Sequence, residues 1–243
     1  MILKILKITS ILLLLGYIIF AAIWSYQTPR GEICTELKIE IADVFEVHFI
    51  DKAEVVKMIT EAGLMPTGQP MGDINTEAIE DCLRRNLLIR KVECFKTNDH
   101  KLKLQIEQRI PILRVMSFYG NFYIDKDGKV MPISQNYSAR LTIASGHIEK
   151  QFAEGELYKF ALFLRNDTLW NAQIQQIDVQ KNHDITLIPT VGNQRIVMGQ
   201  LGDFKLKMDN LRAFYLDGCN RFGWNKYKTI NLRYNGQVIC SAN

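Results

Sequence analysis

The chain has 243 residues, of which 47% are hydrophobic and 23% are charged, with 30 Lys and Arg against 26 Asp and Glu. Two of the basic residues, Lys4 and Lys7, precede the first hydrophobic run, which leaves 28 basic against 26 acidic residues in the remainder. A nearly neutral region of this size has no electrostatic footprint for nucleic acid, and it is long enough for one large domain or two small ones.

The hydrophobic run extends from Ile8 to Tyr26 and contains no charged residue. About 19 apolar residues are enough for a helix to cross the ~30 Å hydrocarbon core of a bilayer, so this run predicts a transmembrane helix. By the positive-inside rule, Lys4 and Lys7 predict a cytoplasmic tail over residues 1–7 and extracytoplasmic domains after a linker over residues 27–34. The alternative is a cleaved signal peptide, whose apolar core is usually shorter, about 7 to 15 residues.

Residues 35–110 predict a β-α-α-β-β unit. Thr35 to Phe49 has the partial alternation of a strand with a short extension, and Asp51 with Glu54 has the spacing of a capping box at a helix start. Apolar periodicity predicts the other elements. The first helix has Ala53, Val56, Ile59 and Ala62 on one face, and a second helix begins at Asn75 or Thr76 and has Ile79, Cys82, Leu83 and Leu87 on one face. Two strands follow, over Arg90–Phe95 and Leu102–Ile106.

Residues 111–243 predict a mostly antiparallel β domain with flanking helices. The intervals between Leu157, Phe160, Ala161 and Leu164 predict one helix, and Phe204 to Cys219 predicts another. Short extended runs predict strands at Leu113–Phe118, Phe122–Asp125, Lys129–Ile133, Arg140–Ala144, Ile174–Val179, Ile185–Pro189, Arg195–Met198, Thr229–Tyr234 and Gln237–Ser241. The last two runs flank Asn235-Gly236, the dipeptide preferred in a two-residue type I′ hairpin turn.

The residue types that carry catalysis or metal binding form no recognisable motif. The histidines His48, His100, His147 and His183 lie far apart, and none has zinc-ligand spacing. Asp125-Lys-Asp127-Gly128 opens like a calcium loop but lacks the later ligands, which favours a hairpin turn. The five cysteines Cys34, Cys82, Cys94, Cys219 and Cys240 are too few and scattered for a disulfide framework, at least one is unpaired, and Cys82 and Cys94 are predicted on apolar faces. We therefore predict no catalytic, metal or cofactor site and a protein that binds other proteins.

Three segments, in this order, resemble the FtsQ/DivIB family of bacterial cell-division proteins. Lys91 to Val115 is similar to the alternating strands that close the family's POTRA domain, Tyr123 to Ser134 to the element that opens its β domain, and Thr229 to Ile239 to its terminal strand pair. The resemblance covers nearly the whole chain, and the overall sequence resembles the Bacteroidetes branch. The family's E-R-x-P-I signature reads Gln108-Arg109-Ile110-Pro111-Ile112 here, which puts any salt bridge of the replaced glutamate in question.

The resemblance implies a non-enzymatic divisome scaffold, anchored in the inner membrane at the division site, with residues 35–110 as the POTRA domain and residues 111–243 as the β domain. It also implies single-span partners of the FtsB and FtsL type, which add a strand to the sheet edge and so govern septal peptidoglycan synthesis. Carried over by motif, the partner-binding residues are Arg233, Tyr234, Gly236 and Val238, while Ile230 and Leu232 face the core. The structural alternative for Tyr234 is an ordinary half-buried strand aromatic.

Two other hypotheses come from different functional classes. A membrane-anchored POTRA chaperone or envelope assembly factor would share the first domain, but it would bind varied unfolded strands instead of one partner complex. An anchored cell-wall hydrolase would share the topology, but the sequence offers no residue for its chemistry.

Overall fold

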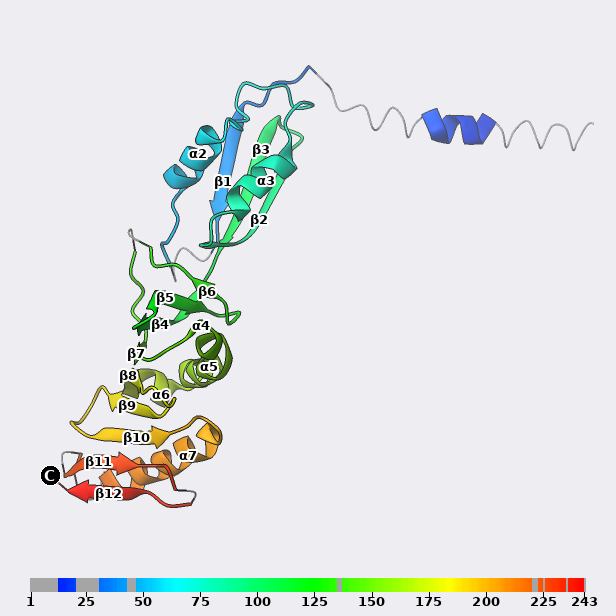
Figure 1. The fold of residues 1–243 in the computed structure, drawn as a ribbon. Helices are drawn as coiled ribbons and strands as arrows, with labels where there is room; N and C mark the ends of the chain where they lie inside the picture. Colours follow the sequence, from blue (N-terminus) through cyan, green and yellow to red (C-terminus); the bar gives the residue numbers. More distant parts are fainter. Residues whose placement is uncertain are drawn as a thin grey trace, which may run out of the picture. The chain divides into compact units, whose positions relative to one another are not determined.

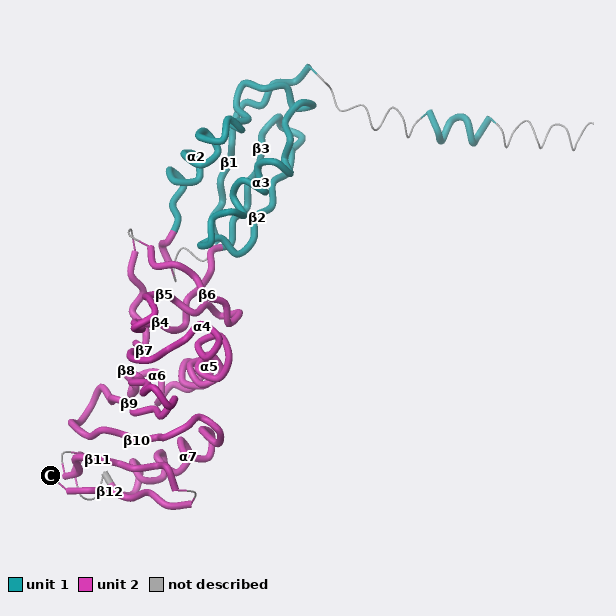
Figure 2. The backbone as a smooth tube through the Cα atoms, in the orientation of Figure 1, with its two compact units in different colours: residues 1–42, 50–107 teal, residues 43–49, 108–243 magenta. Residues whose placement is uncertain are grey.

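The computed structural model describes residues 13–20, 31–42, 47–134, 137–219, 223–224, 226–234 and 236–242. The run from Ile8 to Tyr26 lies mostly outside these residues; of this run, the structure describes residues 13–20, which are helical. Across the described ranges, none of the helices has both the length and the apolar character needed to cross a bilayer. The chain divides into two compact units, residues 1–42 with 50–107 and residues 43–49 with 108–243 (Figure 2).

The first unit is a three-stranded sheet with two helices (Figure 1). Strand β1 (Glu36–Ile41) pairs in parallel with the central strand β3 (Lys101–Gln108), and β2 (Ile89–Lys96) lies on the other side of β3. Helices α2 (Lys52–Glu61) and α3 (Thr76–Arg84) connect β1 to β2 in the chain. The predicted β-α-α-β-β order is therefore confirmed.

Helix α2 begins where its cap was predicted but buries a different face. The Asp51 carboxylate accepts a hydrogen bond from the backbone N–H of Glu54 at 2.8 Å, as expected of an N-cap. Val55 and Ile59 are the buried residues of the helix, whereas Ala53 is exposed. The predicted stripe through Ala53 was wrong because Ala is small enough to fit either face, so the larger Val55 and Ile59 decide which face is buried.

Helix α3 follows its predicted pattern more closely. The Asn75 side chain accepts a hydrogen bond from the backbone N–H of Ala78 at 3.0 Å, and Ile79 and Leu83 are buried. Leu87 was placed on the same face, but it lies beyond the end of the helix and is exposed.

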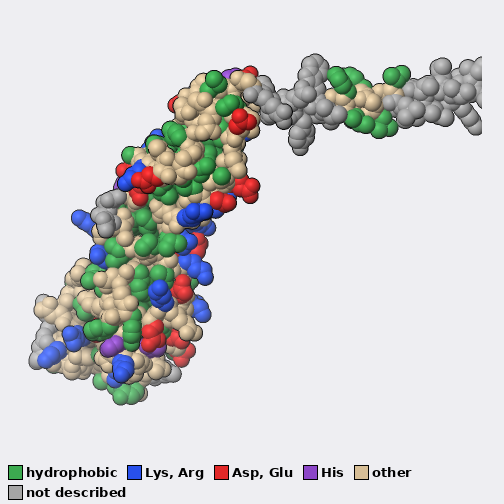
Figure 3. All heavy atoms as spheres, turned by 45° about the horizontal axis from the view of Figure 1, so that its top comes forward, with side chains coloured by type: hydrophobic (Ala, Val, Ile, Leu, Met, Phe, Trp, Pro, Cys, Tyr) green, Lys and Arg blue, Asp and Glu red, His purple; other side chains and the backbone are tan. Residues whose placement is uncertain are grey.

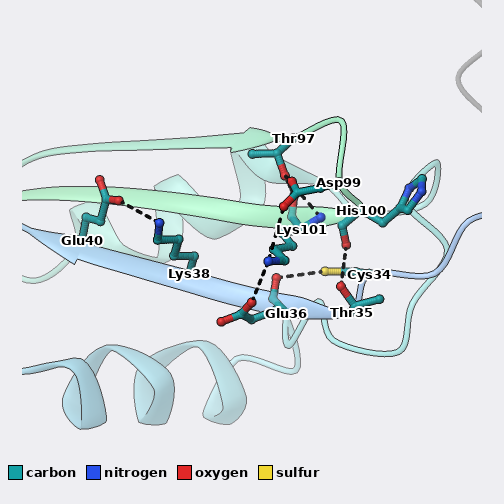
Figure 4. A network of polar contacts seen from close by, with 9 residues as sticks. All are labelled: Cys34, Thr35, Glu36, Lys38, Glu40, Thr97, Asp99, His100 and Lys101. Carbon is teal, nitrogen blue, oxygen red and sulfur yellow. Dashed lines mark hydrogen bonds and ion pairs between the residues drawn. The ribbon is translucent and has the colours of Figure 1, made fainter.

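Charged side chains pair along the outer face of β1 and β3. Glu36 lies directly opposite Lys101 in the parallel register, and the Lys101 Nζ lies 3.3 Å from carboxylate oxygens of both Glu36 and Asp99 (Figure 4). Hydrogen bonds to Glu36 and then to Asp99 raise the pKa of Lys101. These exposed pairs favour the observed register more than they add to stability, because solvent screens them.

The second unit is built on a nine-stranded sheet whose order is β12-β11-β10-β9-β8-β7-β4-β5-β6, which can be followed along Figure 1. Its strands are β4 (Pro111–Ser117), β5 (Gly120–Asp125), β6 (Val130–Met131), β7 (Ile143–Gly146), β8 (Ile174–Val179), β9 (Ile185–Pro189), β10 (Arg195–Gly199), β11 (Tyr227–Asn231) and β12 (Ile239–Ala242). Most neighbours are antiparallel, as predicted. The pairs β4–β7, β7–β8 and β10–β11 are parallel, which the sequence did not indicate.

Helices pack against one face of this sheet, and the buried side chains of the helices and strands together form the hydrophobic core of the second unit. The predicted helix around Leu157 is longer than expected and runs as α4 (Lys150–Phe152), the π-helical segment η1 (Ala153–Leu157) and α5 (Tyr158–Asn166). The predicted C-terminal helix is α7 (Phe204–Phe214) continued by the π-helical η2 (Tyr215–Cys219). A short helix, α6 (Thr168–Gln173), was not predicted.

A side-chain cluster explains why α6 forms despite its length. The Asp167 carboxylate accepts hydrogen bonds from the backbone N–H groups of Leu169 and Trp170 and pairs with the Arg212 guanidinium. Burial raises the pKa of Asp167, but these hydrogen bonds and the Arg212 charge outweigh burial and leave the pKa lowered. The fully buried Trp170 ring lies 5.5 Å from the Arg212 guanidinium carbon. Arg212 of α7 therefore contacts both Trp170 of α6 and Asp167, the residue that caps α6.

The opposite face of the sheet carries mostly polar residues. One row of directly opposed residues crosses seven strands and consists of Met116, Ser145, Asp178, Thr186, Val197, Asn231 and Ile239. Polar side chains separate most of the apolar ones, so this row of described residues forms no continuous apolar stripe.

The Gln108 side chain holds the segment with Val47 and Phe49 in the second unit. Its side chain is fully buried, its Oε1 accepts a hydrogen bond from the Phe49 N–H at 2.9 Å, and its Nε2 donates to the Val47 carbonyl at 3.2 Å. The predicted extension of the first strand through Val47 and Phe49 was therefore wrong. These residues alternate because they are buried in the second unit, where the Phe49 ring meets Tyr123 edge-on, and not because they continue β1.

Replacing Gln108 by glutamate should destabilise the protein by about 3 kcal/mol at pH 8, because an ionised carboxylate cannot donate to Val47 and loses its solvation. Burial should raise the pKa of the introduced carboxylate, so the folded state holds a proton that the unfolded state has released. Stability of Gln108→Glu should therefore fall as pH rises from about 4 toward 8. Urea unfolding at both pH values measures this, with the exposed Gln180→Glu as control; equal stability of Gln108→Glu at both would contradict the assignment.

The Asp125 carboxylate organises the turn between β5 and β6. One oxygen accepts hydrogen bonds from the backbone N–H groups of Asp127 and Lys129, and the other lies 3.0 Å from the Arg109 guanidinium. Gly128 has φ +77°, the left-handed conformation that such a turn requires. The predicted hairpin turn is confirmed. The carboxylate is buried and already accepts three hydrogen bonds from the protein, so its role is to hold the turn.

Candidate functional site

Strand β12 lies at one end of the nine-stranded sheet and pairs only with β11 among the described residues. It has four residues, which include neither Pro nor Lys, the residues that often block an exposed edge. Ile239 is 47% exposed, while Cys240 is half-buried against the core. Burial raises the pKa of the Cys240 thiol, so it behaves as a small apolar side chain. The strand thus combines an anchored face with backbone groups available to another chain.

The connection between β11 and β12 is longer than the predicted two-residue turn at Asn235-Gly236. Of that dipeptide, Asn235 lies outside the described residues. Asn231 pairs with Ile239, whereas a two-residue turn at 235–236 would place Asn231 opposite Cys240. Leu232 is buried, and its N–H donates to the Val197 carbonyl at 2.8 Å, which continues the parallel ladder with β10, whereas the pairing with β12 stops at Asn231.

Arg233 is the predicted partner-binding residue with the most internal contacts. Its Nη2 lies 2.7 Å from the Asp184 carboxylate in the turn between β8 and β9. Its side chain also covers Gly199, where an added Cβ would lie 2.9 Å from the Arg233 Cγ. The sequence analysis missed Asp184, and no local signal links two residues 49 positions apart. Arg233 therefore positions the loop after β11 as well as facing solvent.

Two of the predicted residues, Gly236 and Val238, line a shallow groove next to the start of β12, whereas Tyr234 does not. Tyr234 is 55% exposed, which contradicts the half-buried strand aromatic considered as its alternative. Gly236 has φ +72° and lines the groove, of about 520 Å³, together with Val238. The other wall belongs to the C-terminal helix and consists of Asn210, Ala213, Phe214, Asp217 and Gly218. The structure thus brings Gly236 and Val238 together, with the Tyr234 side chain in solvent.

The described residues offer little for catalysis. They contain no group of three His, Cys, Asp or Glu side chains that could hold a metal ion. Burial, with a smaller contribution from the Glu80 carboxylate, raises the pKa of the Cys94 thiol to about 12, so this thiol is not a nucleophile at neutral pH. Charges of both signs are interspersed on the face seen in Figure 3, which argues against a one-sign surface for nucleic acid.

The edge strand β2 of the first unit differs from β12. The Glu80 carboxylate of α3 accepts a hydrogen bond from the Cys94 N–H of β2 at 2.7 Å and is itself held by Arg84. An added strand that paired with Cys94 would have to displace this charge-assisted bond. The edge of β2 is therefore partly closed at its centre.

Comparison with known proteins finds a matching family model for each of the two units. Residues 110–241 match the family model described as FtsQ/DivIB, C-terminal related, and residues 32–107 match a POTRA-like domain. The cell division protein FtsQ of Streptomyces collinus is similar to this chain, with 31% identity over 93 residues, 38% of this chain and 34% of that protein. The match thus spans about a third of that relative's length.

Proposed function

Because the chain belongs to the FtsQ/DivIB family of cell-division proteins, we propose that it is a non-enzymatic scaffold of the division machinery that recruits single-span partners of the FtsB and FtsL type. The observation that carries the proposal is β12, an edge strand without a blocking residue, next to a groove and the exposed Tyr234. In strand addition, backbone hydrogen bonds supply affinity and alternate side chains supply selectivity.

The location follows from the same proposal. The uncharged run from Ile8 to Tyr26 would hold the chain in the inner membrane, with both folded units on the extracytoplasmic side and the partners' own spans beside it. The scaffold would then govern septal peptidoglycan synthesis through its partners, which carry the chemistry. The POTRA unit would direct localisation to the division site.

The alternative of a POTRA chaperone is less well supported. A chaperone that captured unfolded strands at β2 would meet the bond between the Glu80 carboxylate and the Cys94 N–H, at the centre of that edge. The four-residue β12 has no such obstruction among the described residues. This difference favours a partner site on the second unit.

Replacing Tyr234 by alanine should reduce recovery of the partner pair about tenfold when tagged full-length protein is purified from cells in detergent, because aromatic residues dominate such interfaces. Its exposure predicts an unchanged melting temperature. The matched control is Tyr119→Ala, which removes an equally exposed tyrosine from the turn between β4 and β5. Equal recovery with both variants would remove Tyr234 from the interface, and recovery of no division protein by the unmodified chain would overturn the proposed function.

A further inference from the structure

Two cavities adjoin each other near the start of β4 and β7, away from β12. The first has a volume of about 520 Å³ and the second about 340 Å³, and they share Arg140, Leu141 and Arg165 in their linings. Together they fall in the size range of protein sites for small ligands and short peptide segments. Residues of the second unit supply all of the lining.

Arginine supplies the only charges in either lining. No Asp or Glu contributes to the described walls of the two cavities, so Arg140 and Arg165 are uncompensated there. Arg140 is exposed, and no hydrogen bond or ion pair joins it to another described residue. Arg165 is half-buried and oriented by its Nη1, which donates to the Pro111 carbonyl at 3.0 Å. Because a guanidinium has five N–H donors, most of those on Arg165 remain available.

The rest of the lining is mixed in a way that suits a peptide. Leu164 and Ile174 are buried side chains that form part of the floor, and Asn171 lines the same cavity with an amide that can donate and accept. A free inorganic anion is favoured by charges that converge on one point. Here the two arginines line both cavities, and buried apolar side chains stand beside polar ones in the same lining, a mixture that suits alternating apolar and acidic side chains on an extended chain.

We propose that this groove, lined by Arg140 and Arg165, binds an extended acidic segment of a protein partner. The segment would place a carboxylate against the two guanidinium groups and an apolar side chain on the floor around Leu164 and Ile174. This site is distinct from β12 and does not depend on strand addition there.

The test is fluorescence anisotropy of the full-length protein in detergent with a labelled nonapeptide of alternating Asp and Leu. The same peptide with Asn for Asp should bind at least about fivefold more weakly, and Arg140→Gln should weaken binding of the acidic peptide to a similar extent. Arg140 has no described partner in the fold, so its substitution should leave the melting temperature unchanged. The matched control is Arg195→Gln, which removes one exposed charge from β10 and should not change binding.

Equal binding of the acidic and amide peptides would overturn the proposal, as would unchanged binding by Arg140→Gln. A third arm uses N-acetyl-aspartate amide as competitor. If this single residue bound as tightly as the peptide and displaced it, the site would be one for a small anion and the proposal of an extended segment would be wrong. Displacement only at much higher concentrations of the competitor would support binding of an extended segment. Tyr234→Ala should bind the peptide normally, so failure at one surface is distinguishable from failure at the other.

Discussion

Replacing Gly146 by alanine should destabilise the second unit by about 4 kcal/mol, a large share of the ~5–15 kcal/mol that holds a domain folded. Gly146 ends β7 with φ +106°, a conformation that costs an L-residue roughly 1–3 kcal/mol. An added Cβ would also lie 2.2 Å from the Val179 carbonyl oxygen of β8. That oxygen accepts a hydrogen bond from the His147 N–H at 2.9 Å, so moving it away would break the contact that joins the two strands.

The control for Gly146→Ala is Gly120→Ala. Gly120 also has a positive φ, of +134°, but nothing lies within 4 Å of an added Cβ there. Urea unfolding should show a loss of about 1–3 kcal/mol for Gly120→Ala from backbone strain, and a distinctly larger loss for Gly146→Ala. Equal losses would mean that the close packing of β7 on β8 is not as described.

Periodic apolar patterns predicted most strands and helices because burial on one face dictates both the pattern and the structure. Strands β8 and β9 match their predicted runs, since buried residues recur along each of them between more accessible ones and both runs end at clear turn residues. The pattern misled at Val47 and Phe49, whose alternation comes from burial outside the first sheet. Helix α6 was missed because six residues are too few to show helical periodicity, and its stability comes from the Asp167 cap and the distant Arg212.

Features of the candidate site that depend on neighbouring residues in the sequence could be predicted, whereas contacts between residues far apart in the sequence could not. The left-handed conformation of Gly236 follows from its residue type and its place in a turn, whereas the sequence left open whether Tyr234 is exposed or half-buried. The predicted two-residue turn at Asn235-Gly236 was wrong, since Asn231 pairs with Ile239 and β11 is also held by β10, a non-local strand to which the Leu232 N–H is bonded. Contacts such as Arg233 with Asp184 require the full sheet order, which a single sequence does not specify.

The second large effect is expected at the partner edge, where strand addition depends on backbone N–H groups. The Val238 N–H, directly before β12, makes no hydrogen bond to the described residues, so it is available to an added strand. Proline at this position removes that donor without removing a bond of the fold. A partner carbonyl left without its donor costs about 1–3 kcal/mol, which is roughly 5- to 150-fold in affinity.

The measurement that tests strand addition most directly is recovery of the partner pair with full-length Val238→Pro, compared with Val238→Ala. Alanine shortens the valine side chain, which is half-buried against the core, whereas proline keeps a side chain of three carbons; of the two variants, only proline lacks the N–H. With equal melting temperatures for the two variants, the account predicts roughly tenfold lower recovery with proline and near-normal recovery with alanine. Near-normal recovery with both would contradict partner binding by strand addition at β12.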